Sequence, residues 1–317
     1  MEKSQVDMSL YDRGMDMGAS FIHHPDENNA IVKLHQQFNL PMLDWNNTRW
    51  AVVRENDSMP YNQARVDAAS AKVDKAFEAV LNLSSTLQRD VSVYTALRHL
   101  HQYQLIDDPL SQTFVAEQEF FYGSTINYLS AKYLFDGYME NEAPDTPDKI
   151  PAFGYTKMLD RIIQSSPDDT PLNILLDHEV TEVNVQEDKR VIIKCRNGQI
   201  YEADAVIVTL PLGVLKANDV KFTPDLSTKK KGAIKRVGFG TINKFALEFS
   251  HRFWSKDTQQ MTVAPQDIAD RGKFSILITF HTVANKPVVM TYAVSQFGED
   301  SEMLSDKELK DIGNQAC

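Results

Sequence analysis

The stretch from Ala203 to Trp254 constrains the fold of this chain more than any other part of the sequence. Its first apolar run, Ala205 to Leu210, is rich in β-branched residues and ends at Pro211, which is typical of a strand buried on both faces. Its second run, Asn243 to Phe249, alternates strictly and predicts a strand with two different faces. One face carries Lys244, Ala246 and Glu248, and the other carries Phe245, Leu247 and Phe249. Because a strand is a rigid element, Lys244 is expected to have a fixed position.

A basic segment and two glycines separate these two runs. Lys229 to Lys231 form an isolated cluster in an acidic chain, so we expect the solvated start of a helix here and not a basic binding patch. Gly238 and Gly240 have no Cβ, which makes them points where another part of the chain or a ligand can come close.

The motifs of this stretch follow one another in a specific order. They are T-L-P-L-G-V-L-K, F-x-P-x-L, K-x-x-A-I and V-G-F-G-x-x-N-K-x-x-L-x-F, and the stretch closes with F-W. This order resembles the flavin-containing amine oxidases, the family of polyamine oxidases and lysine-specific histone demethylases. The resemblance implies a catalytic role for Lys244, because the matching family lysine holds a water against N5 of FAD. It also places Thr209, Leu210 and Pro211 near the cofactor. Without these motifs, an exposed strand lysine is the alternative for Lys244.

A second motif, D-M-G-A-S-F-I-H-H, runs from Asp16 to His24. Gly18 and Ala19 are small, so the backbone can approach a planar ligand there, although small residues also make ordinary tight turns. The motif resembles the family segment that passes beside the isoalloxazine ring. This resemblance implies that Gly18, Ala19, Ser20 and Phe21 bind the cofactor, with Phe21 in place of the family's tryptophan.

His23 matches the family histidine that lies near the substrate amine in polyamine oxidases. An imidazole there can accept a hydrogen bond from the substrate or adjust its protonation. The alternative is a partly buried histidine bonded to the backbone. The adjacent His23 and His24 do not predict a metal site, because neighbours on a strand point to opposite faces and no cluster of carboxylates or cysteines lies nearby in sequence.

A helical block is predicted to follow this motif. Apolar spacing predicts helices over Ala30 to Leu40 and Tyr61 to Leu83, separated by a polar, irregular segment from Asp44 to Pro60. Ser92 and Asp108-Pro109 are typical helix starts. The core stripe of the long helix is Val66, Val73, Phe77, Val80 and Leu81. In the family, the substrate domain lies in insertions of this kind.

Aromatic residues and then acidic residues follow the helical block. In the family, the segment that matches Glu117 to Tyr133 borders the substrate cavity. The acidic tract from Asp136 to Asp148 would attract a polycation if it lay at the mouth of that cavity, whereas a solvated loop is the simpler interpretation. Phe153 to Leu159 resembles the helix that returns the family's chain to the cofactor domain.

Further strands are predicted on both sides of the Ala203 to Trp254 stretch. Val180 matches the family valine whose backbone binds the adenine of FAD. Asn197-Gly198 is a strong hairpin turn signal. A helix is expected to start near Ser305. The predicted strands are Asn173 to Leu176, Glu179 to Val185, Arg190 to Arg196, Gln199 to Ala203, Phe274 to Phe280 and Pro287 to Val294.

Composition limits the possible function and location. The net charge of −11 argues against general nucleic-acid binding and favours cationic ligands. Cys195 and Cys317 do not form a disulfide framework. No apolar run reaches transmembrane length, and the first residues lack the apolar core of a secretion signal. We therefore expect a soluble intracellular protein, cytoplasmic by default, without a membrane partner.

The expected fold class is mixed α/β: part of a Rossmann-like FAD-binding domain with an inserted helical and β substrate domain. The expected division is part of the FAD-binding domain for residues 1–30, mainly helical substrate domain for 31–152, FAD-binding domain for 153–216, and the substrate-domain sheet with the segment that follows it for 217–317. No G-x-G-x-x-G turn for the FAD pyrophosphate precedes Asp16, and the chain stops at Cys317 before the family's second FAD-binding segment. The resemblance is therefore to a family member incomplete at both ends.

The predicted function is that of an FAD-dependent amine oxidase. Its substrate would be a polyamine-like secondary amine, which is oxidised to an imine by hydride transfer to flavin N5, and O2 would reoxidise the flavin to give H2O2. One alternative is an inactive fragment or interaction remnant that cannot bind FAD alone. Another is a flavin desaturase or porphyrinogen oxidase, against which the Asn243-Lys244 pair argues.

Overall fold

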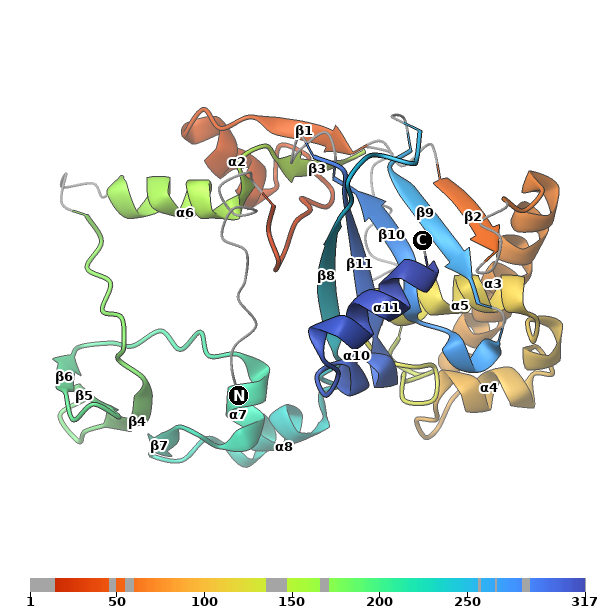
Figure 1. Cartoon of the computed structure of the whole chain (residues 1–317). Helices are drawn as coiled ribbons and strands as arrows, with labels where there is room; N and C mark the ends of the chain where they lie inside the picture. Colours follow the sequence, from red (N-terminus) through yellow and green to blue (C-terminus); the bar gives the residue numbers. More distant parts are fainter. Residues whose placement is uncertain are drawn as a thin grey trace. The chain divides into compact units, whose positions relative to one another are not determined.

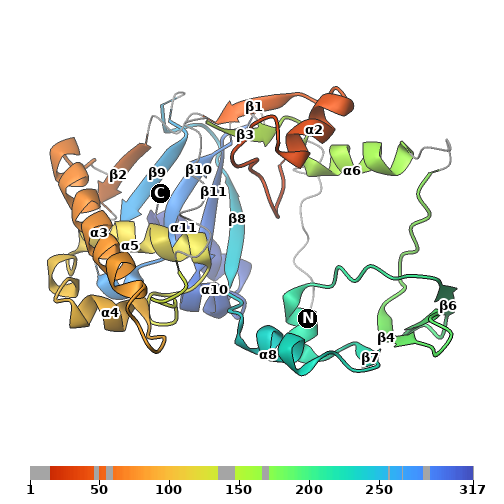
Figure 2. The ribbon, with the colours of Figure 1, turned by 180° about the vertical axis from the view of Figure 1, so that it is seen from behind.

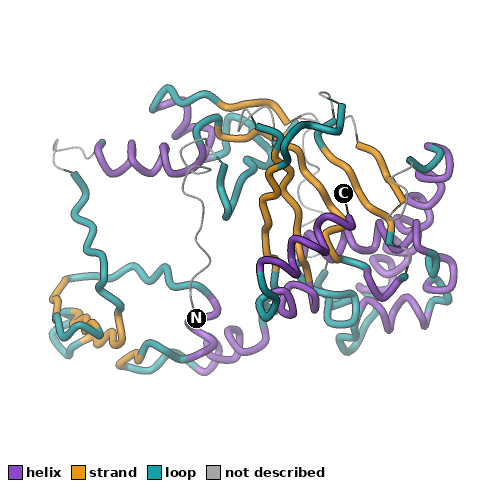
Figure 3. The backbone as a smooth tube through the Cα atoms, viewed as in Figure 1, coloured by secondary structure: helices purple, strands orange, loops and turns teal. Residues whose placement is uncertain are grey.

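The computed structural model describes residues 15–45, 50–54, 60–134, 147–165, 171–255, 258–265, 267–280 and 286–316. The chain forms two compact units (Figure 1). The first contains Met1–Ser165 together with Gly240–Cys317, and the second contains Ser166–Phe239. The finer division into four segments by cofactor and substrate domain stays a prediction. Helices and strands occur in both units, which confirms the mixed α/β class (Figure 3).

A five-stranded sheet is the centre of the first unit. Its strand order is β2-β9-β10-β11-β8, with β2 and β9 parallel and all other neighbours antiparallel. This sheet contains three predicted strands, now at β8, β10 and β11, and two strands that sequence patterns missed. The strands are β2 (Trp50–Arg54), β8 (Ile242–Glu248), β9 (Gln260–Ala264), β10 (Lys273–Thr279) and β11 (Val288–Val294).

The edge strand β8 presents two faces, as its alternation predicts. Phe245 packs with Phe274 and lies in a cluster with apolar residues of α10 (Ser295–Ser301) and α11 (Asp306–Ala316). Ala246 belongs to the cluster on the opposite face. In Figures 1 and 2, α10 and α11 lie on one side of the sheet, and α3 (Gln63–Ser84) and α5 (Pro109–Tyr122) lie on the other. Lys244 therefore shares the face that is turned away from α10 and α11.

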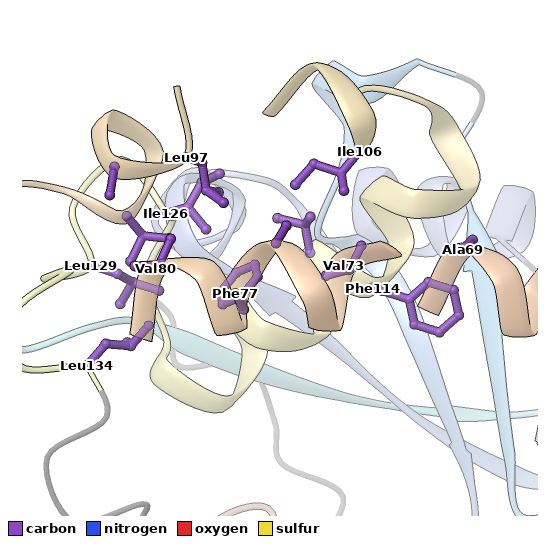
Figure 4. Packing of buried hydrophobic residues seen from close by; sticks show 14 of the residues in the cluster. Ala69, Val73, Phe77, Val80, Leu97, Ile106, Phe114, Ile126, Leu129 and Leu134 are labelled. Carbon is purple, nitrogen blue, oxygen red and sulfur yellow. The ribbon is translucent and has the colours of Figure 1, made fainter. Parts of the chain in front are cut away.

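The helical block packs on itself and on the sheet through one apolar cluster (Figure 4). Its helices are α3 (Gln63–Ser84), α4 (Val93–His99), the short 3-10 helix η1 (Tyr103–Leu105) and α5 (Pro109–Tyr122). Side chains of Asn62, Ser92 and Asp108 accept hydrogen bonds from free amides at the starts of α3, α4 and α5. The predicted α3 stripe is buried at Val66, Val73, Phe77 and Val80, and Leu81 is partly buried.

Gly240 and Gly123 join this block to β8. Gly123 ends α5 in a left-handed conformation with φ 63°, which a glycine adopts at little cost. Its carbonyl oxygen accepts a hydrogen bond from Thr241 at 2.8 Å. A Cβ on Gly240 would lie 2.2 Å from that same oxygen. Gly240 is therefore a point of close chain approach, one of the two possibilities its sequence suggests, whereas a Cβ on Gly238 would meet nothing within 4 Å.

Two short strands, two α-helices and the 3-10 helix η2 (Ile268–Asp270) complete the first unit. β1 (Met42–Trp45) pairs antiparallel with β3 (Asp148–Pro151), and Ile22 forms a bridge with Lys149 of β3. α2 (Ala30–Gln37) is capped by Asn29, and α6 (Gly154–Gln164) follows β3. The prediction of an irregular segment from Asp44 to Pro60 is wrong in part, because β1 ends in it and β2 lies wholly within it.

The second unit has a four-stranded sheet in the order β6-β5-β4-β7. Its elements are β4 (Val180–Val185), β5 (Val191–Cys195), β6 (Ile200–Ala203), α7 (Leu212–Ala217), β7 (Lys221–Thr223) and α8 (Thr228–Arg236). Three of the predicted strands are confirmed at β4, β5 and β6, and Gly198 has the positive φ that the predicted hairpin turn requires. The lysine cluster lies in the exposed first turn of α8, as predicted.

Two predicted strands of the second unit do not form. Residues 173–176 and 205–210 are irregular, and Ile207 is 89% exposed. A strand is stable only when another strand takes up its backbone hydrogen bonds. Within the described part of the chain, no strand pairs with either segment. The prediction that Ala205 to Leu210 is buried on both faces is therefore wrong for this structure.

Candidate functional site around Lys244

The side chain of Lys244 joins β8 to the loop that carries the second motif. Its Nζ donates to the Ser20 hydroxyl at 2.8 Å, to the Asp16 carbonyl at 3.2 Å and to the Gly18 carbonyl. The Tyr292 ring on β11 lies 5.7 Å from Nζ and adds a cation–π contact. Three acceptors match the three N–H donors of an ammonium group. A water held by Lys244, as the resemblance implies, would have to replace or share one of these contacts.

Burial and a nearby carboxylate act on the charge of Lys244 in opposite directions. Burial lowers the pKa of Lys244 to about 8, and the Asp16 carboxylate opposes this shift by favouring the charged form. Burial also raises the pKa of Asp16, against the opposing effects of the Tyr155 amide and the Lys244 charge. Each charge therefore favours the ionised form of the other group.

The Asp16 side chain ties the same loop to α6. Both of its carboxylate oxygens accept from the Tyr155 amide, at 2.9 and 3.2 Å. Free amides at a helix N-terminus attract anions, which explains the position of this carboxylate. The Tyr155 hydroxyl donates to the Phe21 carbonyl at 2.9 Å. The loop is thus held from two sides, by β8 and by α6.

The outer surface of the loop is open at Gly18 and Ala19. Both residues are exposed, and a Cβ built on Gly18 would meet nothing within 4 Å. Ser20 is buried instead, with its hydroxyl donating to the Asp16 carbonyl at 2.9 Å. The exposed backbone leaves room for a planar group beside the residues that hold Lys244. This part of the chain therefore fits a flavin ring, and the cofactor roles of Gly18, Ala19 and Ser20 stay predictions.

Phe21 lies in an aromatic cluster. Its ring centroid is 5.3 Å from that of Trp45 and 6.2 Å from that of Phe280. The partly buried ring packs against the core on the same sheet face as Lys244. Packing therefore accounts for an aromatic residue at this position, and the predicted cofactor contact of Phe21 stays a prediction.

His23 points to a carboxylate that sequence reasoning did not assign to it. Its Nδ1 lies 2.9 Å from Oδ2 of Asp148, and the His23 side chain is 65% exposed. The hydrogen bond to Asp148 raises the pKa of His23, although partial burial opposes the shift. The backbone-bonded alternative is not what the structure shows. Of the acidic tract, residues 136–146 lie outside the described residues.

The remaining predicted cofactor residues belong to the second unit. Val180 begins β4 and packs in the same apolar cluster as Leu210. Thr209 and Pro211 are exposed beside it, and Pro211 precedes α7. The structure thus brings Val180 and Leu210 into one cluster and groups Lys244 with the 16–23 loop in the other unit. Their shared role in binding FAD stays a prediction.

Four residues near the site had no assigned role at the sequence level: Asp16, Asp148, Tyr155 and Asn243. Asn243 is the neighbour of Lys244 and donates from Nδ2 to the Gly298 carbonyl at 2.7 Å and to the Ser301 hydroxyl at 3.0 Å. It thereby fixes β8 to α10. The Asn-Lys dipeptide was the available signal for Asn243. The contacts of Asp16, Asp148 and Tyr155 join residues that are too distant in sequence for a pattern to connect.

Other features of the described residues do not suggest a second centre. No cluster of metal-ligating side chains occurs among them. No helix in the described ranges is long and apolar enough to cross a membrane. A cavity of about 910 Å³ lies between α7, β7 and α8, and one of about 340 Å³ lies beside Arg271 and Glu119. None of the predicted site residues lines either cavity.

Similarity to known proteins covers almost the whole chain. A rice (Oryza sativa subsp. japonica) polyamine oxidase 4 is 29% identical over 316 residues, or 94% of this chain and 61% of the relative. A probable polyamine oxidase 4 of Arabidopsis thaliana is 27% identical over 310 residues, or 92% of this chain and 59% of the relative. The chain thus spans about 60% of the length of these two relatives.

A second kind of relative matches a shorter region. The rice lysine-specific histone demethylase 1 homolog 3 is 36% identical over 142 residues, which is 45% of this chain and 17% of that protein. Among solved structures, a putrescine oxidase double mutant redesigned in its cofactor binding has a TM-score of 0.68 at 14% identity. The structural match covers 94% of this chain and 69% of the putrescine oxidase chain. It supports the fold.

The family assignment depends on a match over most of the sequence. Residues 5–313 fit the family model described as flavin containing amine oxidoreductase. The implied cofactor of this family is FAD, consistent with the open backbone beside Lys244. The chain therefore belongs to the flavin-containing amine oxidoreductase family.

Proposed function

We propose that this chain carries the site of an FAD-dependent oxidase that converts a polyamine-like secondary amine to an imine. The imine is then hydrolysed to an aldehyde and a shorter amine. The family match and the polyamine oxidase relatives support the reaction class. The observation that carries the proposal is that Lys244 and the Asp16 to His23 motif, more than 200 residues apart in sequence, meet in one hydrogen-bonded site.

The residues of this site would hold the flavin ring and orient groups around it. The exposed backbone at Gly18 and Ala19 would lie against the ring, and Lys244 would provide a fixed cationic donor beside it. When FAD is bound, it supplies the redox chemistry, accepting hydride at N5 from the carbon next to the amine nitrogen and passing two electrons to dioxygen to give hydrogen peroxide. Val180 and Thr209 to Pro211 would hold other parts of the cofactor.

His23 would control the protonation of the substrate amine. A protonated nitrogen has no lone pair to assist the loss of hydride, so the ammonium form must lose a proton before oxidation. A neutral His23 can accept that proton, and Asp148 lies where it can hold the resulting imidazolium. Because Asp148 raises the pKa of His23, the neutral imidazole becomes available at a higher pH than for an isolated histidine.

The test is a visible absorption spectrum of the protein purified with excess FAD, followed by anaerobic addition of spermine or N-acetylated spermine. A bound flavin that bleaches with amine supports the proposal. Lys244→Met should slow flavin reduction or reoxidation and leave the fold intact. Lys273→Met, at an exposed lysine of the same sheet, is the matched control and should behave as the unmodified protein.

Two results would contradict the proposal in different ways. A bound flavin that no amine reduces would exclude amine oxidation with these substrates. A protein that binds no FAD would favour the alternative of an inactive or interaction-only chain. The exposed apolar segment at residues 205–210 is the observation that favours this alternative, because it contains the predicted cofactor residues Thr209 and Leu210 and precedes Pro211.

A further inference from the structure

The charge of Lys244 is maintained in surroundings that disfavour it. The side chain is partly buried, and its hydrogen-bond partners are two carbonyl oxygens and one hydroxyl, none of which carries a full charge. Neutral acceptors satisfy the N–H donors but do not repay the full cost of removing an ammonium from water. A nearby negative charge would offset part of this cost.

Asp16 supplies such a charge and is itself held in place. Both oxygens of its carboxylate accept from the Tyr155 amide, and its carbonyl oxygen accepts from Lys244 at 3.2 Å, which places the negative charge close to the ammonium. The first turn of α6 stabilises a negative charge at this position. Asp16 thus contacts the lysine through its main chain and balances its charge through its side chain.

We propose that Asp16 is a positioning residue of this site: its carboxylate, fixed by the α6 amide, places a negative charge near Lys244, and its carbonyl oxygen holds the ammonium on the 16–20 loop. The inference deepens the proposed function, on which the role of Lys244 rests. Nothing in the sequence motif distinguishes this role for Asp16 from that of an ordinary turn residue, and the pairing with Tyr155 is visible only in the structure.

The other titratable groups near Lys244 do not supply the same charge. Among the described residues, Tyr292 faces it from β11, and Tyr155 adjoins Asp16 from α6. Burial raises the pKa of both phenols, and for Tyr155 the Asp16 charge adds to the rise. Both phenols are therefore neutral at physiological pH, which leaves Asp16 as the source of the balancing charge among these groups.

The test is a titration of the protein labelled with 13C at lysine Cε, followed by NMR, with Lys244→Arg used to assign the signal. The unmodified protein should show a Lys244 midpoint near pH 8. Asp16→Asn keeps the size of the side chain and one acceptor for the Tyr155 amide but removes the charge. It should lower the Lys244 midpoint by about one pH unit. Asp44→Asn, at an exposed carboxylate of β1, is the control and should leave the midpoint unchanged.

A reciprocal titration keeps the proposal testable if Asp16→Asn does not fold. The 13C-labelled Asp16 carboxylate should titrate at a higher pH in Lys244→Met, because coupling between two groups acts on both. An unchanged Lys244 midpoint in folded Asp16→Asn, or an unchanged Asp16 midpoint in Lys244→Met, would overturn the proposal. Neither titration requires flavin or amine, so a chain that binds no FAD still gives a clear result.

Discussion

Two apolar segments of the chain have similar sequences and opposite surroundings. β10 contains S-I-L-I-T and residues 205–209 read A-V-I-V-T, yet the first is buried and the second is exposed. β10 lies between β9 and β11, which take up the hydrogen bonds of both its edges, and both its faces are covered by apolar clusters. Residues 205–210 have no such partner in the described part of the chain. An apolar pattern thus indicates that a segment needs burial and a pairing partner. Whether it obtains them depends on the neighbouring elements.

Replacing the same residue type in both segments measures this difference directly. Ile278→Ala in β10 should lower the free energy of unfolding by about 3 kcal/mol, because a buried isoleucine leaves both lost contacts and a cavity. Ile207→Ala should change it by less than about 0.5 kcal/mol, since that side chain is 89% exposed. Urea unfolding followed by circular dichroism gives both values. Equal losses at the two positions would show that residues 205–210 are buried in solution.

A pair of glycines tests whether close backbone approach is confined to the first unit. Gly240→Ala should destabilise the protein by about 2 kcal/mol, because its Cβ would lie 2.2 Å from the Gly123 carbonyl oxygen and the backbone would have to move. Gly238→Ala, two residues earlier in the second unit, places its Cβ in open space and should have an effect below about 0.5 kcal/mol. The measurement is the same unfolding experiment. A harmless Gly240→Ala would be incompatible with the contact between α5 and β8.

The pH dependence of stability should distinguish Lys244 from an exposed lysine of the second unit. The pKa of Lys244 is lowered from 10.5 to about 8 in the folded state, so between these values the unfolded chain binds more protons. The contribution of Lys244 to the free energy of unfolding therefore rises from about pH 8 to about pH 10.5. Allowing for solvent screening, the rise should be on the order of 1 kcal/mol.

Lys244→Met should remove this rise, whereas Lys235→Met, on the exposed surface of α8, should retain it. Chemical unfolding of the three proteins at several pH values provides the curves. The same slope in all three proteins would mean that Lys244 is solvated in solution.

The smallest expected effect on the free energy of unfolding comes from the His23–Asp148 pair. This pair is a weak surface interaction of the first unit. Asp148 raises the pKa of His23, so the pair stabilises the folded state below the unfolded pKa of 6.5, and this stability is lost as pH rises through the higher folded pKa. Asp148→Asn should cost about 0.5 kcal/mol in mildly acidic solution and less at alkaline pH. NMR titration of the His23 ring checks the cause, since its midpoint should fall in the variant. A midpoint that does not move would remove Asp148 from the proposed proton path.

The sequence predicts best what depends on neighbouring residues. The Ser92 and Asp108 caps and the Asn197-Gly198 turn are local signals, and each lies where it was expected. β9 and α10 were missed because their sequences are short and mixed in polarity. The alternation of residues along β8 predicts which strand face carries Lys244. The same alternation contains no information about which distant group that face contacts.

The candidate site was only partly accessible to sequence reasoning. The family resemblance selected Lys244 and the Asp16 to His23 motif without showing how they meet. The bonds from Lys244 span 224 to 228 residues of sequence, a distance over which no periodicity acts. The links from Asp16 to Tyr155 and from His23 to Asp148 likewise required the folded structure.

The two neighbouring side chains at positions 243 and 244 bind to opposite sides of the sheet. Asn243 reaches α10, and Lys244 reaches the 16–20 loop. Since a slip of one residue turns every side chain of a strand to the other face, a shifted β8 would present an amide to the loop and an amine to the helix. The dipeptide therefore fixes the register of β8, which among the described residues pairs with another strand on one side only.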